Sequence, residues 1–438
     1  MVGASLEDSL ISFCRAPQQF LLERARTDGP VALYRVGDEL FVSVSDPDLV
    51  HEVLHGDMAD YEKGPLYDLV RVLFGDGIFT AEREQWTGQH EVIAPIFARH
   101  RNRRLISTIA DLTAQQIDRW RRRGDQEDDQ VMPALKRLAF DVVSIGLFSL
   151  YDDGQRTALF DEMYRLDRLP LVSFTYFRQR IPLEQFDAII DRSEQSTVSV
   201  RRRIDEMLYA IADRRLAGHD EADDAIGALM ASAFMRQLSP ERRRAVLRDN
   251  IGSLLTAGYV STGESMFWAL YHLARHRDAQ VCARAEVAAA PVPLVDAPPY
   301  LSAVLNESMR LYPPAWYIGR TTRRAMALGG VEIPAGTQVV CSPFVLHRTP
   351  ASWPNAEQFQ PERFLPGSTV APRSFIPFGS GPRACLGRAL SMMEMTSIVS
   401  ATVTAFDLEL PSDAPVTLTG SYSMQPREPI VLRLRPRP

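Results

Sequence analysis

The longest helical pattern of the chain, residues 240–276, constrains the fold more than any other segment. It runs from "PERRRAVLRDN" to "MFWALYHLARH", and its apolar residues occupy too many faces for a surface helix. We therefore expect a helix that passes through the core. Gly258 and Gly263 interrupt it within "LTAGYVSTGES", although a glycine in a helix interior costs about 1 kcal/mol relative to alanine. The glycines in this stretch must therefore have a packing or a functional reason.

The rest of the chain predicts a helix-rich fold with small sheets. Residues 30–46 have two β-branched and aromatic runs around Gly37-Asp38, which is typical of a hairpin, and Asp46-Pro47 can open a helix. Nearly everything from about 82 to 290 has helical spacing. The later segments are a helix at about 298–311, short strands at 329–344, an irregular stretch at 355–384, a helix at about 386–405 and a terminal hairpin at 416–435. This layout predicts the α+β class, mainly α.

Composition narrows the class of protein. With 45% hydrophobic and 24% charged residues the chain is an ordinary globular protein, and its net charge of −6 argues against a nucleic-acid partner. Arginine supplies nearly all the positive charge, which we interpret as the codon bias of a GC-rich bacterial genome. The four cysteines are far apart, which is unlike a disulfide framework or a zinc site. Residues 1–20 lack the pattern of a signal peptide, and no window is apolar enough for a membrane span. We therefore expect a soluble, cytoplasmic protein.

The sharpest motif is "FGSGPRACLG", residues 378–387. Its glycines and Pro382 prevent regular structure, and Cys385 lies where a helix is expected to begin. Backbone N–H groups are unpaired at such a point and the helix dipole is positive, so both stabilise a thiolate. A thiolate placed there suits a soft metal, of which haem iron is one candidate.

This motif resembles the haem-binding signature of the cytochrome P450 family. The matching positions are Phe378, Gly379, Gly381, Arg383, Cys385 and Gly387. Three further segments resemble the family in the expected order: "EQWTGQHEVIAPIF" (84–97), "LNESMRLYPP" (305–314) and "FQPERF" (359–364). The resemblance implies a single cytochrome P450 domain over residues 1–438, with a helix-rich core at about 82–290 and the ligand loop at 375–387. It also implies a long central helix over a haem b.

The resemblance assigns roles to particular residues. Cys385 would be the thiolate ligand of the iron, and Phe378 would shield it from water. Gly379 and Gly381 would let the backbone approach the porphyrin. The haem propionates would be bound by Trp86, His90, Arg320 and Arg383. The structural ion-pair trio would be Glu307, Arg310 and Arg363. Glu307 and Arg310 share one helix face because they are three residues apart.

The central helix departs from the family pattern. Aligned on Ala257-Gly258, the usual acid of the acid–alcohol pair is Val260 and the alcohol is Ser261, followed by Thr262. Small residues at 257 and 258 would leave room for dioxygen and would allow the helix to bulge. A valine cannot carry protons. Ser261 with Thr262 and water could relay them, a substrate hydroxyl could complete the relay, or the enzyme could use peroxide or oxidative coupling.

The resemblance places the substrate contacts in several segments, which are largely apolar and aromatic. Besides the central helix, these are residues 62–80, 166–182, 315–319 and 419–426. They favour a hydrophobic small molecule, such as a terpenoid, polyketide or lipid-like compound of bacterial secondary metabolism. An anionic substrate is the alternative, because these segments also contain four arginines: Arg71, Arg168, Arg178 and Arg180.

The resemblance also implies the source of electrons. The chain stops soon after the expected terminal hairpin, so we expect no fused reductase and a separate ferredoxin or flavodoxin with its reductase. Two alternatives to ordinary monooxygenation remain: a P450 that uses peroxide or performs oxidative coupling, and a haem-thiolate sensor without turnover.

Overall fold

The computed structural model describes residues 12–13, 16–36, 39–128, 130–167, 197–219, 222–290, 294, 296–371, 373–419 and 423–437. It is 59% helical with small sheets, which confirms the predicted class. The chain divides into two compact units. Unit 1 comprises residues 1–64, 113–135 and 261–438, and unit 2 comprises residues 65–112 and 136–260.

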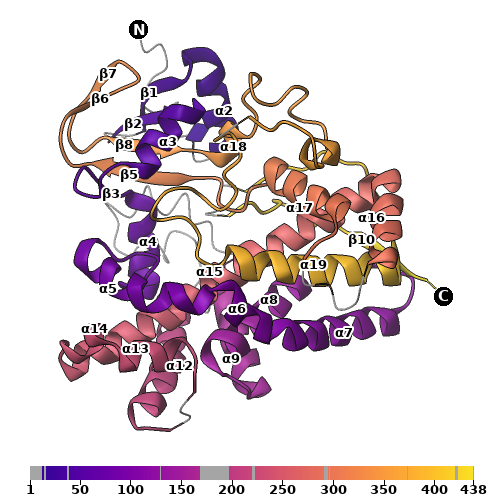
Figure 1. Ribbon diagram of the computed structural model, residues 1–438, viewed down its shortest axis with the longest axis horizontal. Coiled ribbons are helices and arrows are strands. Elements are labelled where there is room, and N and C mark those ends of the chain that lie inside the picture. Colours follow the sequence, from indigo (N-terminus) through magenta and orange to yellow (C-terminus); the bar gives the residue numbers. More distant parts are fainter. Residues whose placement is uncertain are drawn as a thin grey trace. The chain divides into compact units, whose positions relative to one another are not determined.

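Unit 1 is built on a five-stranded sheet in the order β1-β2-β8-β5-β3 (Figure 1). Its strands are β1 (Val31–Val36), β2 (Glu39–Val44), β3 (Tyr61–Lys63), β5 (Ile318–Thr322) and β8 (Gln338–Cys341). β1 and β2 pair antiparallel, as the hairpin prediction required, although the turn itself lies outside the described residues. β2 then pairs in parallel with β8, almost 300 residues further along the chain. Two smaller ribbons are β6 (Met326–Leu328) with β7 (Val331–Ile333), and β4 (Gln126–Asp128) with β10 (Leu432–Pro436) and β9 (Phe406–Glu409).

Unit 1 also contains helices. They are α2 (Pro17–Asp28), α3 (Pro47–His55), α16 (Arg277–Ala289), α17 (Pro299–Leu311), α18 (Pro343–Leu346), the short helix η3 (Pro361–Phe364) and α19 (Arg388–Ala405). Asp46 caps α3, because its carboxylate accepts hydrogen bonds from the N–H groups of Asp48 and Leu49. α16, α17 and α19 pack on one another, and α17 also packs on η3. The packing of η3 on α17 attaches part of the irregular segment before Cys385 to that helix.

Unit 2 is helical. Its elements are α4 (Pro65–Phe74), α5 (Arg83–Ile93), η1 (Ala94–Phe97), α6 (Arg99–Asn102), η2 (Arg103–Leu105), α9 (Asp153–Asp167), α12 (Thr197–Leu216), α13 (Ala225–Ala231) and α14 (Ala233–Arg236). Helix α7 (Ile106–Arg123) and helix α8 (Val131–Phe148) contribute residues to both units. Lys136 on α8 donates a 2.6 Å hydrogen bond to Asp167 at the end of α9, and both side chains are 1% exposed.

The predicted core helix is α15 (Pro240–Arg275), which is drawn as the longest helix in Figure 1. From Asn250 to Leu273 most of its residues are buried, as the all-round apolar pattern predicts. It is α-helical at every residue, so the bulge that we expected beside Gly258 is absent.

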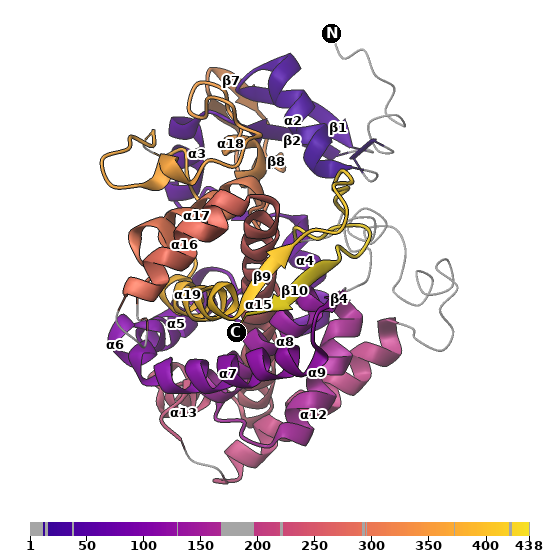
Figure 2. The same cartoon turned by 90° about the vertical axis from the view of Figure 1, so that its right-hand side faces the viewer.

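The terminal hairpin was predicted too long. A short pairing joins Leu418 with Pro426, whereas the last strand, β10, pairs with β9 at the end of α19 (Figure 2). Pro429 lies between the two pieces and has no N–H to donate, which interrupts a continuous ladder. Leu432 and Leu434 are buried in the ribbon that β10 forms instead. None of the described helices is long and apolar enough to cross a membrane.

Candidate functional site

The cysteine loop in unit 1 has a defined backbone geometry. The N–H of Cys385 donates to the carbonyl of Phe378 at 2.9 Å, which closes the loop, and α19 begins three residues later. Gly379 and Gly381 have φ angles of +70° and +76°, a region that favours glycine. A Cβ on Gly381 would lie 2.1 Å from the carbonyl oxygen of Leu54 on α3. This contact with α3 by itself requires glycine at 381.

Cys385 itself is exposed and is not part of a disulfide. Desolvation in the loop raises the pKa of its thiol, while the N–H groups of Gly387 and Arg388 and the charge of Arg388 lower it. These N–H groups lie at the start of α19, where helix donors are unpaired. A coordinated metal deprotonates such a thiol outright. Arg388 also lies 5.7 Å over the ring of the half-buried Phe378.

A buried cation lies on the sheet of the same unit. Arg320 on β5 is only 8% exposed, yet the hydrogen bond found for it goes to the carbonyl of Gly319, at 2.9 Å. Among the described residues no carboxylate pairs with it. A buried guanidinium without an anion is costly, so this position suits an anionic ligand. A Cβ on Gly379 would meet little more than Ile318, at 3.7 Å, so the loop is open on that side. Cys385, Arg320 and the open loop therefore fit a haem with its propionates.

The charged trio lies together in unit 1. Arg310 donates two hydrogen bonds to Glu307, at 2.7 and 2.8 Å, and both side chains are 0% exposed. Arg363 lies 3.5 Å from the same carboxylate. Three carbonyls, of His347, Ala356 and Gln358, accept the remaining donors of Arg310. The trio thus fixes the irregular segment after residue 347.

His347 has a structural role that its position in the sequence did not predict. This residue is fully buried, its Nδ1 lies 3.3 Å from the Arg310 carbonyl, and its Nε2 lies 3.0 Å from the N–H of Ile376. Since the Ile376 N–H can only donate, Nε2 accepts and Nδ1 carries the proton. The Ile376 carbonyl in turn accepts from Gly379. His347 therefore connects the trio to the cysteine loop, although its only signal in the sequence was the step "LHRTP".

The middle of α15 differs from the rest of the helix. Ala257 is exposed and Ser261 is partly exposed, whereas Val260 is 2% exposed. Ala257 and Ser261 share a face because they are four residues apart. The Thr262 hydroxyl turns elsewhere, since it hydrogen-bonds Ser391 on α19 at 3.2 Å.

Gly258 has a packing explanation. A Cβ at this position would lie 2.6 Å from Cγ2 of Val143 on α8, within unit 2. Glycine is therefore required by the close approach of two helices. The prediction that it bulges the helix was wrong, and Ala257 rather than Gly258 is the small residue on the Ser261 face.

Trp86 and His90 lie one turn apart on α5 of unit 2. Their ring centroids are 4.5 Å apart, and Trp86 is buried while His90 is partly exposed. The pair forms one surface of α5 on which an indole N–H and an imidazole N–H can both serve an anionic group.

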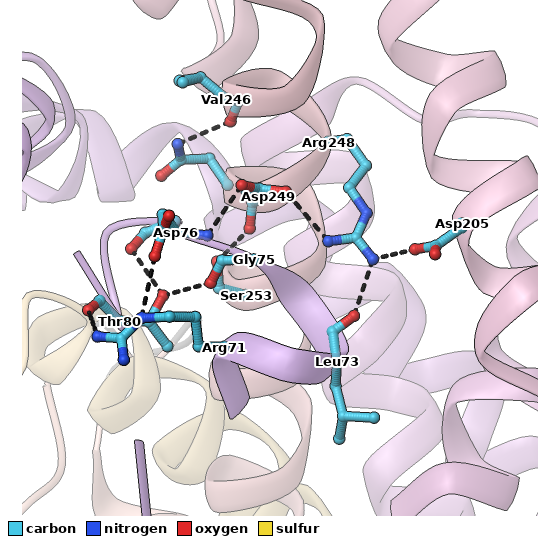
Figure 3. Close-up of polar contacts among 12 residues, drawn as sticks. Arg71, Leu73, Gly75, Asp76, Thr80, Asp205, Val246, Arg248, Asp249 and Ser253 are labelled. Carbon is cyan, nitrogen blue, oxygen red and sulfur yellow. Dashed lines mark hydrogen bonds and ion pairs between the residues drawn. The ribbon is translucent and has the colours of Figure 1, made fainter. Parts of the chain in front are cut away.

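Arg71 is one of the four arginines that left an anionic substrate as an alternative. Its charge is neutralised within unit 2 (Figure 3). It forms ion pairs with Asp68 and Asp76 and donates to the Thr80 carbonyl at 2.9 Å. The N–H of Asp76 donates to Asp249 on α15 at 2.8 Å, which ties the loop after α4 to that helix. The other three arginines, at 168, 178 and 180, lie outside the described residues, as do most of segment 166–182 and residues 420–422.

Comparison with known proteins identifies the same family as the motifs. The family model described as "Cytochrome P450" matches residues 9–433. Among curated proteins, cytochrome P450 714C3 of Oryza sativa subsp. japonica is 28% identical over 414 residues, which cover 88% of this chain and 78% of the relative. Cyclooctatin synthase of Streptomyces melanosporofaciens is 27% identical over 451 residues, 99% of this chain and 91% of the relative.

Two further similarities extend the comparison. Cyclooctat-9-en-7-ol 5-monooxygenase, also of Streptomyces melanosporofaciens, is 27% identical over 89% of this chain and 84% of the relative. The crystal structure of the cytochrome P450DA heme domain superposes with a TM-score of 0.81 at 22% identity, covering 98% of this chain and 95% of that one.

Proposed function

The chain belongs to the cytochrome P450 family, and on that premise we propose that it uses dioxygen to hydroxylate or epoxidise a hydrophobic small molecule. Family membership makes it an oxidoreductase of the monooxygenase type with a haem b held by a cysteine thiolate. The match of one family model to residues 9–433 supports our view that residues 1–438 form a single P450 domain.

Cys385 is the iron ligand in this proposal, and its loop is the observation that carries the proposal. The loop is closed by the Cys385–Phe378 hydrogen bond, and the N–H groups of Gly387 and Arg388 favour the thiolate. The other exposed cysteine among the described residues, Cys282, lies within α16 and lacks such surroundings.

The remaining cofactor contacts follow from charge. Arg320 would bind one propionate, because it is a buried guanidinium without a carboxylate partner among the described residues. Arg383, Trp86 and His90 would serve the propionates by their matched positions. Glu307, Arg310 and Arg363 have a structural role, since they hold the segment that leads to the loop.

Thiolate-bound haem supplies the oxidising power for C–H bonds. The residues of α15 provide the protons and the space. Ser261 Oγ would donate a hydrogen bond to the dioxygen. It would also pass on a proton from water or from a substrate hydroxyl, since the side chain of Val260 cannot carry a proton. Ala257 keeps the Ser261 face clear. Thr262 holds α15 to α19 through Ser391 and has at most an indirect part in this relay.

The substrate is a neutral, largely hydrocarbon molecule in this proposal. Neutralisation of Arg71 by two carboxylates supports it, because that arginine cannot then bind an anion without breaking its ion pairs. The relative named as the 5-monooxygenase of cyclooctat-9-en-7-ol acts on an alkenol, which is a compound of this kind. A terpenoid of bacterial secondary metabolism is therefore our first choice.

P450s use redox partners, and for this chain we propose a separate ferredoxin or flavodoxin with its reductase. The alternative of peroxide use or oxidative coupling is favoured by one observation, the burial of Val260 at the acid position. Faster turnover with hydrogen peroxide than with any redox partner would select that alternative.

The assignment is tested by the reduced, carbon-monoxide-bound spectrum. We expect the red-shifted Soret band of thiolate ligation in the wild type and in the matched control Cys282→Ala, and its loss in Cys385→Ala. A Cys385→Ala protein with the wild-type spectrum would refute the ligand assignment. Shifts of the ferric Soret band on adding neutral terpenoids, compared with fatty acids and acidic analogues, would then test the substrate class.

A further inference from the structure

The loop that follows α4, residues 75–80, is fastened to α15 by side chains of that helix, all within unit 2 (Figure 3). The N–H of Asp76 donates to the carboxylate of Asp249 at 2.8 Å. The N–H of Ile78 donates to Oδ1 of Asn250 at 3.0 Å. Asp249 is 6% exposed and Asn250 is 1% exposed, so both hydrogen bonds are shielded from water. We call residues 75–80 the anchored loop.

Side chains from α4 and α5 hold the carbonyl groups of the anchored loop. The Asp76 carbonyl accepts hydrogen bonds from Nε2 of Gln85, at 3.1 Å, and of Gln89, at 3.0 Å. Gln89 is 0% exposed. Arg71 donates to the Thr80 carbonyl at 2.9 Å. The anchored loop is therefore fixed from α4, α5 and α15 together.

Two glycines let the anchored loop lie directly on α15. Gly75 has a φ angle of +68°, and a Cβ at this position would overlap the carboxylate of Asp249. A Cβ on Gly77 would overlap the hydroxyl of Ser253 and would lie 2.5 Å from the carbonyl oxygen of Asp249. The backbone of the loop thus lies so close to the helix that no larger residue fits at either position.

The two acceptors on α15 are themselves held in place. Nδ2 of Asn250 donates to the Val246 carbonyl at 2.8 Å, and the Ile78 N–H can only donate, so the orientation of the amide is settled. Arg248 donates to Oδ1 of Asp249 at 3.0 Å, which leaves Oδ2 for the loop. Burying a polar side chain costs free energy unless it is hydrogen-bonded. The polar residues at 249 and 250 therefore serve the loop, because an apolar pair would suit a buried helix better.

The anchors also fix what the loop presents. Ile78 is 7% exposed and Thr80 is 0% exposed, whereas Phe79 between them is 40% exposed. Because both neighbours are held, the direction in which the Phe79 side chain leaves the backbone is fixed as well. The whole anchored loop lies in segment 62–80, where the resemblance places substrate contacts.

We propose that Asp249 and Asn250 are positioning residues that set substrate selectivity, because they make the anchored loop a fixed wall of the substrate site. The proposal rests on the proposed function, since it takes the loop to be part of that site. A ligand that fits against the wall binds without the cost of ordering a loop. A ligand that is too wide must first break several buried hydrogen bonds, so the wall selects by excluding it.

The rigidity of the loop is tested by hydrogen exchange on the haem-loaded enzyme, followed by mass spectrometry of peptides that contain residues 75–80. We expect slow exchange in the wild type, because the amides of Asp76 and Ile78 are buried and hydrogen-bonded. Exchange should be at least tenfold faster in Asn250→Ala, which removes the acceptor of Ile78. The matched control Asn102→Ala removes another buried asparagine of unit 2, which donates to the Phe97 carbonyl, and should leave the exchange of the loop unchanged.

Selectivity is tested with two neutral ligands of the haem iron that differ in width, 1-butylimidazole and 1-tritylimidazole. Their dissociation constants are read from the red shift of the ferric Soret band. The wild type and Asn102→Ala should prefer the slender probe, and Asn250→Ala should reduce this preference several-fold by binding the wide probe more tightly. Gln89→Leu removes one of the two donors to the Asp76 carbonyl and keeps Gln85, so it should shift the preference in the same direction by a smaller factor.

A role in stability alone predicts a different result. It would lower the thermal stability of Asn250→Ala and leave the ratio of the two dissociation constants unchanged. An unchanged ratio in both Asn250→Ala and Gln89→Leu would overturn the proposal, and so would fast exchange of the anchored loop in the wild type. Absence of the thiolate Soret band in the wild type would instead overturn the proposed function.

Discussion

Replacement of His347 by glutamine would isolate the contribution of one buried base to stability. Glutamine keeps an acceptor and a donor at the end of the side chain, so it can still serve the Ile376 N–H, but it cannot take up a proton. Burial lowers the pKa of His347 to about 3, and the charges of Arg310 and Arg348 act in the same direction. The variant therefore differs from the wild type mainly in its response to acid.

The sign and the size of this effect of pH on the free energy of unfolding follow from the linkage between folding and proton binding. The unfolded chain protonates this histidine near its ordinary pKa of 6.5, whereas the folded protein does so only near 3. Between those values the unfolded state binds more protons, so the stabilisation is complete above pH 6.5 and is lost as the pH falls. The slope is about 1.4 kcal/mol per pH unit. Because the unfolded histidine is only half protonated at pH 6.5, the wild type should lose about 2 kcal/mol more than His347→Gln between about pH 6.5 and 4.5.

The assay is urea unfolding of the haem-loaded protein at several pH values, followed by tryptophan fluorescence and the Soret band. Other buried groups cancel in the comparison, including Glu394, whose pKa burial raises well above its ordinary value. A second variant, His347→Phe, orphans the Ile376 N–H and should be less stable by about 1–3 kcal/mol at neutral pH. A free-energy difference between wild type and His347→Gln that stays constant with pH would refute the reasoning.

Three further outcomes are expected. Gly258→Ala should destabilise the protein by about 1–3 kcal/mol in urea unfolding, because the added Cβ would lie 2.6 Å from Val143. Val143→Ala should relieve much of that cost in the double variant. Equal costs of Gly258→Ala with and without Val143→Ala would contradict the contact. Glu307→Gln leaves buried arginine charge uncompensated, so the ratio of Soret to protein absorbance after purification should fall sharply; a normal haem content would exclude the structural role. Lys136→Met should cost about 3–5 kcal/mol, because it removes the buried ammonium that contacts the carboxylate of Asp167, while adding Asp167→Leu should restore most of it. Thermal unfolding of the single and double variants checks this, and an additive loss would count against the pair.

Local patterns were sufficient for much of the fold and site. The periodicity of residues 240–276 predicted α15, and Asp46 predicted the start of α3. The cysteine loop and the Glu307–Arg310 spacing could also be identified, because their geometry depends on residues that are neighbours in sequence. Short-range spacing sets helix faces, caps and tight loops, so it can be recognised without knowing the rest of the chain.

Contacts between distant segments could not be predicted in this way. The sequence determined that a long buried helix with glycines exists and that Cys385 lies at the N-terminus of another helix. Only the tertiary structure decided that Gly258 meets Val143, that β10 pairs with β9, and that His347 joins Arg310 to Ile376. Each of these contacts depends on which distant segment of the chain packs against a given surface. That choice follows from how whole helices and strands pack, and no spacing within one segment encodes it.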